Sequence, residues 1–557
     1  MPTSPHRTVF QRDQSFSQSA LWAQQRAFFA EQGVNAWAGP VPFYVTSNPY
    51  LANSYARVLL RFMQDWSHRP DYDPDEPFYL IELGSGSGRL GFYLIKQLLA
   101  LQQQLGLETL HCVYVLTDFT QINIDYWRQH PAWHIYTDQG VVDFALFDVE
   151  HDTRIHLQQS GHVLGSGEDA HPPRNPCLFI ANYLFDCLLH DVFLVRDQAL
   201  YAATPILATD TANLDTAQQP IALDQVEVDF SYQHIDGTYY GIDAFDTVLQ
   251  HYQAHLDDQH FILPIGGLRC LENLGTLSHQ RYLMLAADKG DTELTELARA
   301  TAPRISLHGN CFSMQVNFHA LGRYVQACGG TAITSPTLPG LTAVAYVQGL
   351  ALDTLPETRQ ALHCHGHTHN PIALYQLYRH IKATRDHCPL EALVSLLSLS
   401  GWDPHIFHWC ITPILAQLDQ ATPRIRQSLA RGLTQVVDNF YALPQTPNTL
   451  LEVGSAFYSL EDYATALQCY QQSLDQSTLS QACAHHQGDT DLLLHNIGLC
   501  YYFLDDYPQA RHYFQQALDC NGELDTARQW LIQIETLAKN TTPQDANTSI
   551  HLAIARD

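Results

Sequence analysis

A glycine-rich turn is the feature of this sequence most able to take part in chemistry. The apolar residues before it predict a buried strand over 78–83, and those after it predict a helix over 90–104. Glycines let backbone approach a ligand closely, because no side chain stands in the way. The turn reads Ile81, Glu82, Leu83, Gly84, Ser85, Gly86, Ser87, Gly88.

Two classes of cofactor use a turn of this kind. A dinucleotide is one, because residues 86–91 satisfy the pattern G-x-G-x-x-G. S-adenosylmethionine is the other, because its cationic amino-acid end would compensate Glu82, a carboxylate in an otherwise apolar strand where an unpaired charge is costly. A third interpretation is purely structural, in which the glycines only tighten the packing of strand on helix.

Carboxylates at the ends of the next two predicted strands favour S-adenosylmethionine. Asp118 follows the strand over 111–116 and can accept both ribose hydroxyls, as a carboxylate also does in dinucleotide folds. Asp148 follows the strand over 141–147, which places a further acceptor near an adenine amino group. Ligands of open α/β sheets bind at this edge, so we expect the three carboxylates and the turn to form one site.

Predicted strands and helices alternate over the first two-thirds of the chain. This rhythm predicts an α/β fold, a doubly wound and mainly parallel Rossmann-like sheet. Further strands are expected over 177–181, 281–286 and 341–347, and a short extended segment over 43–45. Residues 202–260 interrupt the rhythm and are interpreted as an inserted subdomain or lid.

Four segments in this order resemble the MidA family of class I S-adenosylmethionine-dependent methyltransferases. They are Pro42 to Ser47, Glu82 to Gly88, Ile180 to Asp186, and Gln315 to Leu321. The family includes a mitochondrial complex I assembly factor that methylates arginine, so the resemblance implies a methyltransferase acting on a protein side chain. It implies that S-adenosylmethionine is bound by Glu82, Gly84, Ser85, Gly86 and Gly88, to which the ends of the next two predicted strands add Asp118 and Asp148.

The segment after the fourth strand departs from the family at one position. Where the family has Asn-Glu, this chain has Asn182 followed by Tyr183. A carboxylate there would grip a guanidinium through paired hydrogen bonds, which a neutral tyrosine cannot do. Asp186, one helical turn further on, can take that place. We therefore expect Asn182 and Asp186 to line the methyl-acceptor site, with Tyr183 shaping it; in the alternative, Asn182 only binds the strand end and Asp186 caps a helix.

Two segments near the C-terminus repeat one another with the tetratricopeptide pattern. Small residues recur in equivalent positions as Gly454 and Gly498 and as Ala466 and Ala510. The repeats lie 44 residues apart instead of 34, which predicts a longer turn over 477–489. Such repeats bind protein partners or pack on a neighbouring domain.

Composition limits which cellular compartment and which classes of binding partner can be expected for this chain. The formal net charge is -28, which disfavours nucleic acid as a partner, and no apolar run predicts a signal peptide or a membrane span. The 13 cysteines contain no C-x-x-C pair, as in a cytoplasmic protein with free thiols. The histidine-rich stretch 363–369 could chelate a metal from one face of a strand, but a polar linker is the preferred interpretation, so no metal site is predicted.

The domain organisation and function follow from these features. We expect residues 1–370 to form the methyltransferase-like domain, 371–445 a helical connector, 446–537 the tetratricopeptide module, and 538–557 a flexible tail. The expected function is methyl transfer to a protein side chain, with the repeats recruiting the substrate. The alternatives are a catalytically degenerate scaffold that works through its repeats and, from the G-x-G-x-x-G match alone, an NAD-dependent oxidoreductase.

Overall fold

The chain folds into two compact units. The computed structural model describes residues 8–38, 41, 44–209, 222–297, 301–334, 340–367, 371–444, 446–479 and 490–540. The contacts of the first unit join Met1–His380 with two short later segments, Leu399–Asp403 and Tyr441–Leu443. The second unit comprises Ile381–Ser398, Pro404–Phe440 and Pro444–Asp557.

A seven-stranded mixed sheet forms the centre of the first unit. Its order is β17-β18-β12-β7-β2-β3-β4, in which β12, β7, β2, β3 and β4 are parallel and β18 runs antiparallel to both its neighbours. The chain starts at β2, moves outward to β3 and β4, and returns to β7 on the other side of β2. The strands are β2 (Phe78–Glu82), β3 (Cys112–Asp118), β4 (Val142–Leu146), β7 (Cys177–Asn182), β12 (Tyr282–Asp288), β17 (Thr331–Thr334) and β18 (Thr342–Gln348).

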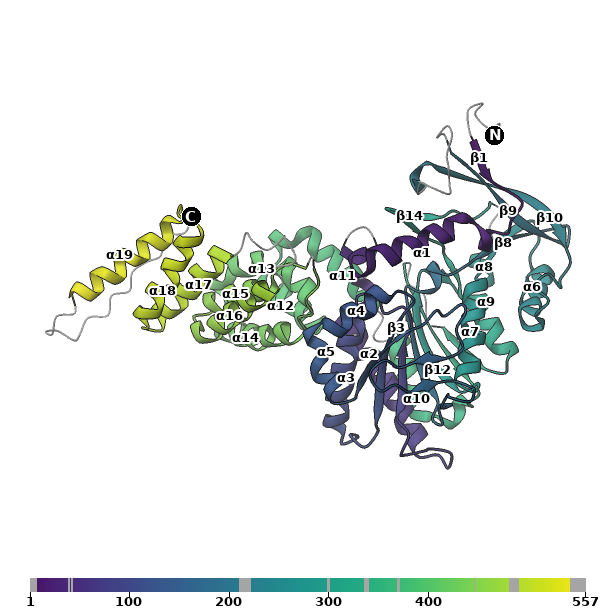
Figure 1. Cartoon of the computed structure of the whole chain (residues 1–557), viewed down its shortest axis with the longest axis horizontal. Helices are drawn as coiled ribbons and strands as arrows, with labels where there is room; N and C mark the ends of the chain where they lie inside the picture. The colour runs from purple at the N-terminus through teal and green to yellow at the C-terminus, as the bar shows by residue number, and fades with distance from the viewer. Residues whose placement is uncertain are drawn as a thin grey trace. The chain divides into compact units, whose positions relative to one another are not determined.

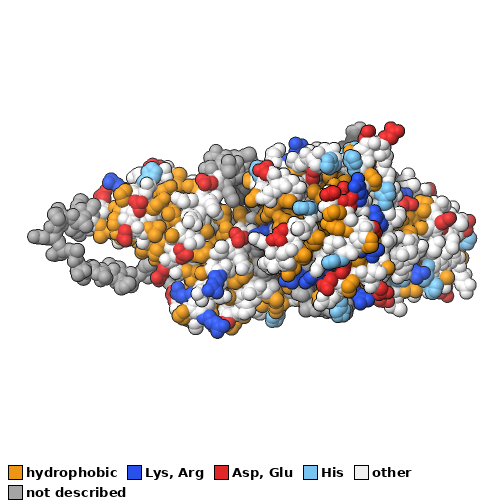
Figure 2. All heavy atoms as spheres, turned by 90° about the horizontal axis from the view of Figure 1, so that it is seen from below, with side chains coloured by type: hydrophobic (Ala, Val, Ile, Leu, Met, Phe, Trp, Pro, Cys, Tyr) orange, Lys and Arg blue, Asp and Glu red, His pale blue; other side chains and the backbone are white. Residues whose placement is uncertain are grey.

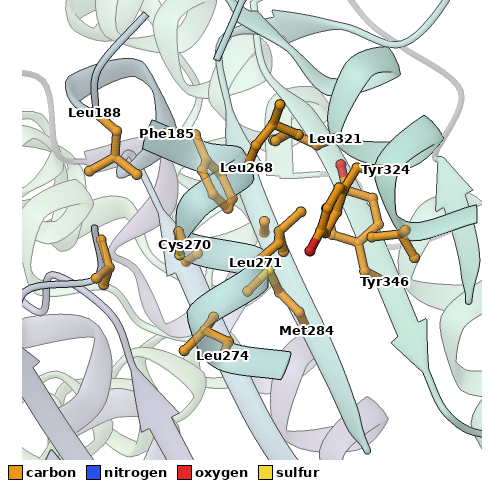
Figure 3. Close-up of a cluster of buried hydrophobic side chains, with 14 of the residues drawn as sticks. Phe185, Leu188, Leu268, Cys270, Leu271, Leu274, Met284, Leu321, Tyr324 and Tyr346 are labelled. Atoms are coloured by element: carbon orange, nitrogen blue, oxygen red, sulfur yellow. The ribbon is translucent and has the colours of Figure 1, made fainter. Parts of the chain in front are cut away.

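Helices cover both faces of this sheet, because its strands alternate their apolar side chains between two cores. Figure 1 shows α2 (Pro49–Ser67) and α3 (Arg89–Leu105) on one side and α7 (Ile265–Leu277) and α9 (Phe318–Ala327) on the other. Along β2, Phe78 and Leu80 join the first core, whereas Tyr79 and Ile81 join the second. In the second core, Leu268, Leu271 and Leu274 of α7 lie against Met284 of β12 (Figure 3).

A second, antiparallel sheet is formed by β1 and by the strands that lie between β7 and β12 in the sequence. It pairs β8 (Asp191–Arg196) with β9 (Ala199–Thr209) and β11 (Gln259–Leu263), while β9 also pairs with β1 (Thr8–Gln11) and β10 (Val226–Ile235). The interrupted rhythm at 202–260 reflects this sheet and α6 (Asp243–His255), although residues 210–221 lie outside the described part. Short pairs complete the unit: β5 (Ile155–His156) with β6 (Val163–Leu164), β13 (Gly290–Asp291) with β16 (Val316–Asn317), and β14 (Ser306–His308) with β15 (Cys311–Ser313).

The second unit consists of helices, and its repeats pack through small residues. A Cβ on Gly454 would lie 2.5 Å from the Tyr470 ring, and one on Gly498 would lie 2.8 Å from Phe514. These pairs join α15 (Thr449–Ser459) to α16 (Tyr463–Leu479) and α17 (Thr490–Phe503) to α18 (Tyr507–Cys520). The remaining helices are α12 (Leu390–Leu399), α13 (Pro404–Gln417), α14 (Pro423–Asp438) and α19 (Asp525–Asn540). The second unit begins at Ile381, within α11 (Pro371–Thr384).

Two sequence predictions of local structure are wrong. Residues 44–46 form a 3-10 helix, not a strand, and residue 43 lies outside the described part. Residues 363–367 of the histidine-rich stretch continue α10 (Pro356–His367) and are not a strand or linker, because Thr358, Leu362 and His365 recur at helical spacing and are buried. Residues 368 and 369 lie outside the described part. His365 Nδ1 lies 2.6 Å from Ser54 Oγ, so this histidine packs against α2.

The predicted turn of 477–489 and tail of 538–557 are described only in part. Helix α16 continues to Leu479, and α19 continues to Asn540. Residues 480–489 and 541–557 lie outside the described part of the chain.

The described part of the chain contains no helix that is both long and apolar enough to cross a bilayer. Its cysteines are free thiols, and no three of its His, Cys, Asp or Glu side chains are gathered in a way that could hold a metal ion. Figure 2 shows acidic and basic side chains interspersed on one face of the molecule, where Lys and Arg form small groups.

Candidate cofactor site

The glycine turn leaves β2 in a conformation that glycine adopts readily. Gly84, Gly86 and Gly88 all have positive φ, at 63°, 54° and 77°. Two hydrogen bonds to Thr117 of β3 hold the turn. Its side-chain Oγ1 donates to the backbone carbonyl of Glu82 at 2.7 Å, and its own backbone carbonyl accepts from Ser85 N at 2.8 Å. The turn is therefore fixed against the neighbouring strand before α3 begins.

Asp118 closes the turn from the end of β3. Its carboxylate accepts hydrogen bonds from Gly86 N at 3.2 Å, from Thr120 N and Oγ1 at 3.0 and 2.8 Å, and from Asn123 Nδ2 at 2.9 Å. Burial raises the pKa of Asp118, and these hydrogen bonds oppose that rise. Asp118, the residue predicted to bind the ribose, thus already accepts several hydrogen bonds from the protein.

A cavity of about 90 Å³ lies at this edge of the sheet. Gly84, Asp118, Asp148 and Tyr183 line it, so four of the predicted site residues come together here. The other lining residues are Gln25, Arg26, Phe29, Trp37, Phe119, Asn123, Phe147, Val149, Leu184, Cys187 and Leu188.

Helix α1 (Ala20–Gln32) and the 3-10 helix Gly33–Ala38 cover the cavity. Arg26 places its guanidinium 4.4 Å from the centre of the Phe119 ring, with Nη2 2.5 Å from Asp148 Oδ2. Trp37 lies against the glycine turn, where a Cβ on Gly86 would meet its ring at 2.6 Å. Both side chains occupy space that a cofactor at this edge of the sheet would need.

Glu82 lies on the other side of the turn and is not part of the cavity lining. It is 5% exposed and accepts a hydrogen bond from Tyr114 Oη at 3.0 Å. Helix α3 passes directly over it, because a Cβ on Gly91 would lie 2.8 Å from Glu82 Oε2. Burial, more than any other cause, raises the pKa of Glu82 to about 8, so this carboxyl is largely protonated at neutral pH.

The predicted acceptor residues lie where β7 ends. Asn182 accepts a hydrogen bond from Tyr55 Oη at 2.8 Å and donates one to Thr46 O at 3.2 Å. Tyr183 has a positive φ of 49° and lines the cavity, and burial raises its pKa. Asn182 therefore ties the strand end to α2 and to the segment before it, while Tyr183 faces the cavity.

Asp186 belongs to a buried pair of carboxylates. It lies in the 3-10 helix Phe185–Cys187, and its backbone N donates to Asp288 Oδ2 at 3.0 Å. Asp186 and Asp288 are 6% and 0% exposed, and burial raises the pKa of each. The proximity of Asp186 raises the pKa of Asp288 further, because two negative charges so close together repel each other.

The chemistry of these residues fits a nucleoside cofactor. The three left-handed glycines form a cradle without side chains, and Asp148 offers an acceptor for an amino group. Asn123 adds a buried Oδ1 that lines the cavity and has no hydrogen-bond partner among the described residues. The volume fits only in part, since sites for ligands of drug size typically enclose about 300 Å³ or more. Accommodating the cofactor therefore requires Arg26 and Trp37 to move.

Sequence reasoning did not identify Arg26, Trp37, Phe119 or Asn123 as site residues. Asn123 carried a usable signal, because it lies one helical turn into the segment that follows Asp118. Arg26 and Trp37 carried none, since they reach the site from an N-terminal helix far from the glycine turn in the sequence.

The comparisons with known proteins bear on the two units differently. The tetratricopeptide repeat family matches residues 445–523, the stretch that contains α15 to α18. No curated protein matches the chain.

Three solved structures resemble the chain weakly. A superfamily member and candidate methyl transferase from Burkholderia thailandensis, bound to S-adenosyl-homocysteine, is 11% identical with a TM-score of 0.38, over 61% of this chain and 88% of that one. An uncharacterized protein of the same superfamily and organism is 13% identical with a TM-score of 0.34, over 61% and 94%. MamA is 12% identical with a TM-score of 0.19, over 34% and 86%. The family match therefore concerns residues 445–523 of the second unit.

Proposed function

We propose that the first unit is a class I S-adenosylmethionine-dependent methyltransferase that acts on a protein side chain. The observation that carries the proposal is the meeting of the glycine turn, Asp118 and Asp148 around one cavity. The five strands β4, β3, β2, β7 and β12 keep the order 3-2-1-4-5 of a Rossmann-like sheet. The cavity lies at the carboxyl ends of the strands near the β2–β7 reversal, where such sheets bind ligands.

Each residue has a distinct part in holding the cofactor. The backbone of Gly84 to Gly88 would approach it closely, and Asp118 would accept from its ribose hydroxyls. Asp148 and Asn123 would accept hydrogen bonds from the base of the cofactor, once the ion pair between Asp148 and Arg26 is broken. Glu82 would act from behind the turn without touching the cofactor, because its side chain contacts Tyr114 and α3. Its negative charge would prevail only above its pKa of about 8.

The bound cofactor would supply an electrophilic methyl group on a sulfonium. The chain has to orient the acceptor and exclude water, which Asn182, Tyr183 and the cover of α1 can do. If the acceptor must lose a proton, Asp186 is the candidate base, because it closely follows Tyr183 and Leu184, which line the cavity. The tetratricopeptide repeats would bind the protein that carries the acceptor.

A scaffold without catalysis is the second candidate. Two observations favour it. Arg26 forms an ion pair with Asp148, and the cavity of about 90 Å³ is small for the cofactor. In that case the repeats would carry the function of the chain.

Calorimetric titration with S-adenosylmethionine and S-adenosyl-homocysteine tests the proposal. We expect micromolar binding by the full chain and loss of binding in Gly86→Ala, where the new Cβ strains a left-handed residue and enters the space through which the bare backbone would approach the cofactor. Gly106→Ala is the matched control, since Gly106 has a φ of 65° at the end of α3 and its Cβ would meet nothing within 4 Å. A folded wild-type chain that binds neither compound would favour the scaffold.

A further inference from the structure

Three residues from late in the chain lie against the glycine turn. Tyr441–Leu443 lie between α14 and α15 in the sequence, yet their contacts assign them to the first unit. Ala442 O accepts hydrogen bonds from Tyr126 Oη at 3.0 Å and from His130 Nε2 at 2.8 Å. Helices α4 (Gln121–Gln129) and α5 (Pro131–Asp138) therefore anchor this segment, with His130 as the N-cap of α5.

The Tyr441 side chain is built into the first unit. It is 3% exposed, and its ring stacks on His130 with centroids 4.2 Å apart and an angle of 16° between the planes. His130 is neutral, because burial lowers its pKa to about 4 and its two ring nitrogens serve Ala442 O and the Ala132 amide. The stack thus holds the tyrosine ring in one orientation.

Tyr441 Oη contacts the turn itself. It donates a hydrogen bond to Ser87 O at 3.0 Å and accepts one from Trp133 Nε1 at 3.1 Å. Trp127 Nε1 donates to the preceding carbonyl, Gly86 O, at 3.1 Å. A Cβ on Gly88 would lie 3.0 Å from both Trp127 Nε1 and Tyr441 Oη. Two successive carbonyls of the turn are therefore held by two aromatic side chains.

Holding these carbonyls fixes the rest of the turn. A peptide group is planar, so an oriented C=O determines the direction of the N–H on its other side. The carbonyls of Gly86 and Ser87 share their peptide planes with the N–H groups of Ser87 and Gly88. Glycines would otherwise let these planes rotate at little cost.

We propose that Tyr441 is a positioning residue for the cofactor turn, supplied by the segment that leads into the tetratricopeptide repeats. The inference rests on the proposed function, because it concerns the affinity of that same site for S-adenosylmethionine. The hydroxyl acts across 354 residues of sequence through a single hydrogen bond to Ser87 O. The repeats match from residue 445, so the anchored segment ends just before them.

Tyr441→Phe in the full chain tests this role, because it retains the ring and its stacking and removes only the hydroxyl. The loss leaves Ser87 O and Trp133 Nε1 without this partner, and we expect the Kd for S-adenosylmethionine to rise about three- to tenfold. Tyr346→Phe is the matched control. Tyr346 is also fully buried in the first unit, but its Oη donates to Phe318 O at 3.4 Å. This control is expected to change the Kd less than about twofold.

Hydrogen exchange without cofactor gives a second readout. Faster exchange of the peptide spanning residues 84–88 in Tyr441→Phe, and not in Tyr346→Phe, would support a role in the turn. An unchanged Kd together with unchanged exchange, in a wild type that binds the cofactor, would overturn the role of Tyr441 alone. Absence of binding by the folded wild type would overturn the proposed function and this inference with it.

Discussion

Glu82 illustrates how the protonation of one buried carboxyl can report on the site. Its pKa of about 8 in the folded chain lies above the value of about 4.3 expected for an unfolded glutamate. Between these values the folded chain retains a proton that the unfolded chain releases. Stability therefore declines as pH rises through this range, by at most about 1.4 kcal/mol per pH unit for one proton.

Glu82→Gln removes the group whose proton the folded chain retains and the unfolded chain releases. We expect its free energy of unfolding, measured in urea from pH 5 to pH 8, to fall less with pH than that of the wild type. Glu108→Gln, at an exposed glutamate, should follow the wild type. Parallel pH profiles for Glu82→Gln and wild type would mean that Glu82 is ionised throughout.

If the proposed function holds, Arg26 would compete with the base of the cofactor for Asp148, with which it pairs in this structure. The pair is partly exposed, at 39% and 21%, so its contribution is about 1 kcal/mol or less. We expect Arg26→Ala to lower the Kd for S-adenosylmethionine up to about fivefold, measured by calorimetry. Arg128→Ala, at an exposed arginine of α4, is the control. Weaker binding by Arg26→Ala would show instead that the guanidinium contacts the cofactor.

The residues of the candidate site were predictable to different degrees. Asp118 and Asp148 follow apolar runs, so their place at the sheet edge could be predicted from strand ends alone. Arg26, Trp37 and Tyr441 reach the site from distant segments, and a contact of that kind leaves no local pattern in a sequence. Glu82 was placed on the correct strand, but the direction of its side chain depends on how closely α3 packs at Gly91.

At the scale of elements, patterns of apolar residues predicted strands and helices well where one face is buried. β2, β3 and β12 begin and end within two residues of the predicted ranges, because their apolar runs are bounded by polar residues. The predictions of a strand or a linker over 363–369 were wrong. The histidines there alternate with other residues, as in a strand, whereas the buried positions of the described part recur at helical spacing. Only the packing of His365 on α2 distinguishes the two patterns.

Gly498 tests the packing of the repeats. An alanine there gains about 1 kcal/mol of helix propensity in isolation, but its Cβ would lie 2.8 Å from Phe514. We expect Gly498→Ala to destabilise the second unit by about 1–3 kcal/mol, as overpacking does, with a lower melting temperature by circular dichroism. Gly522→Ala is the control, because its Cβ would meet only Leu518 O at 4.0 Å. Equal or greater stability of Gly498→Ala would show that the helices can separate freely.

At the scale of the whole molecule, the net charge of -28 is unevenly shared along the chain. Within 445–523, Arg511 is the one Lys or Arg, whereas carboxylates recur along the stretch. This composition favours a basic protein segment as the partner of the repeats and disfavours an acidic one. The shortage of basic residues is evident from the sequence alone, because charge composition does not depend on the fold.

The arrangement of the two units was less predictable than their existence. A change from alternating strands and helices to helices alone indicated two parts, since periodicity shows where the kind of structure changes. Periodicity could not indicate that Leu399–Asp403 and Tyr441–Leu443 rejoin the first unit, because each is a short segment between helices.

The discontinuous path of the chain has a consequence for how such a protein can be rearranged. Exchanging the repeats as one piece requires a crossing point that leaves the contacts of the first unit intact. Here a crossover in the loop before α12 would remove Leu399–Asp403 and Tyr441–Leu443 together with the repeats, and with them the contacts on Ser87 and Trp133. A fusion of this first unit to other repeats retains these contacts only if the junction lies after Leu443. The new repeats would then begin where the present ones do.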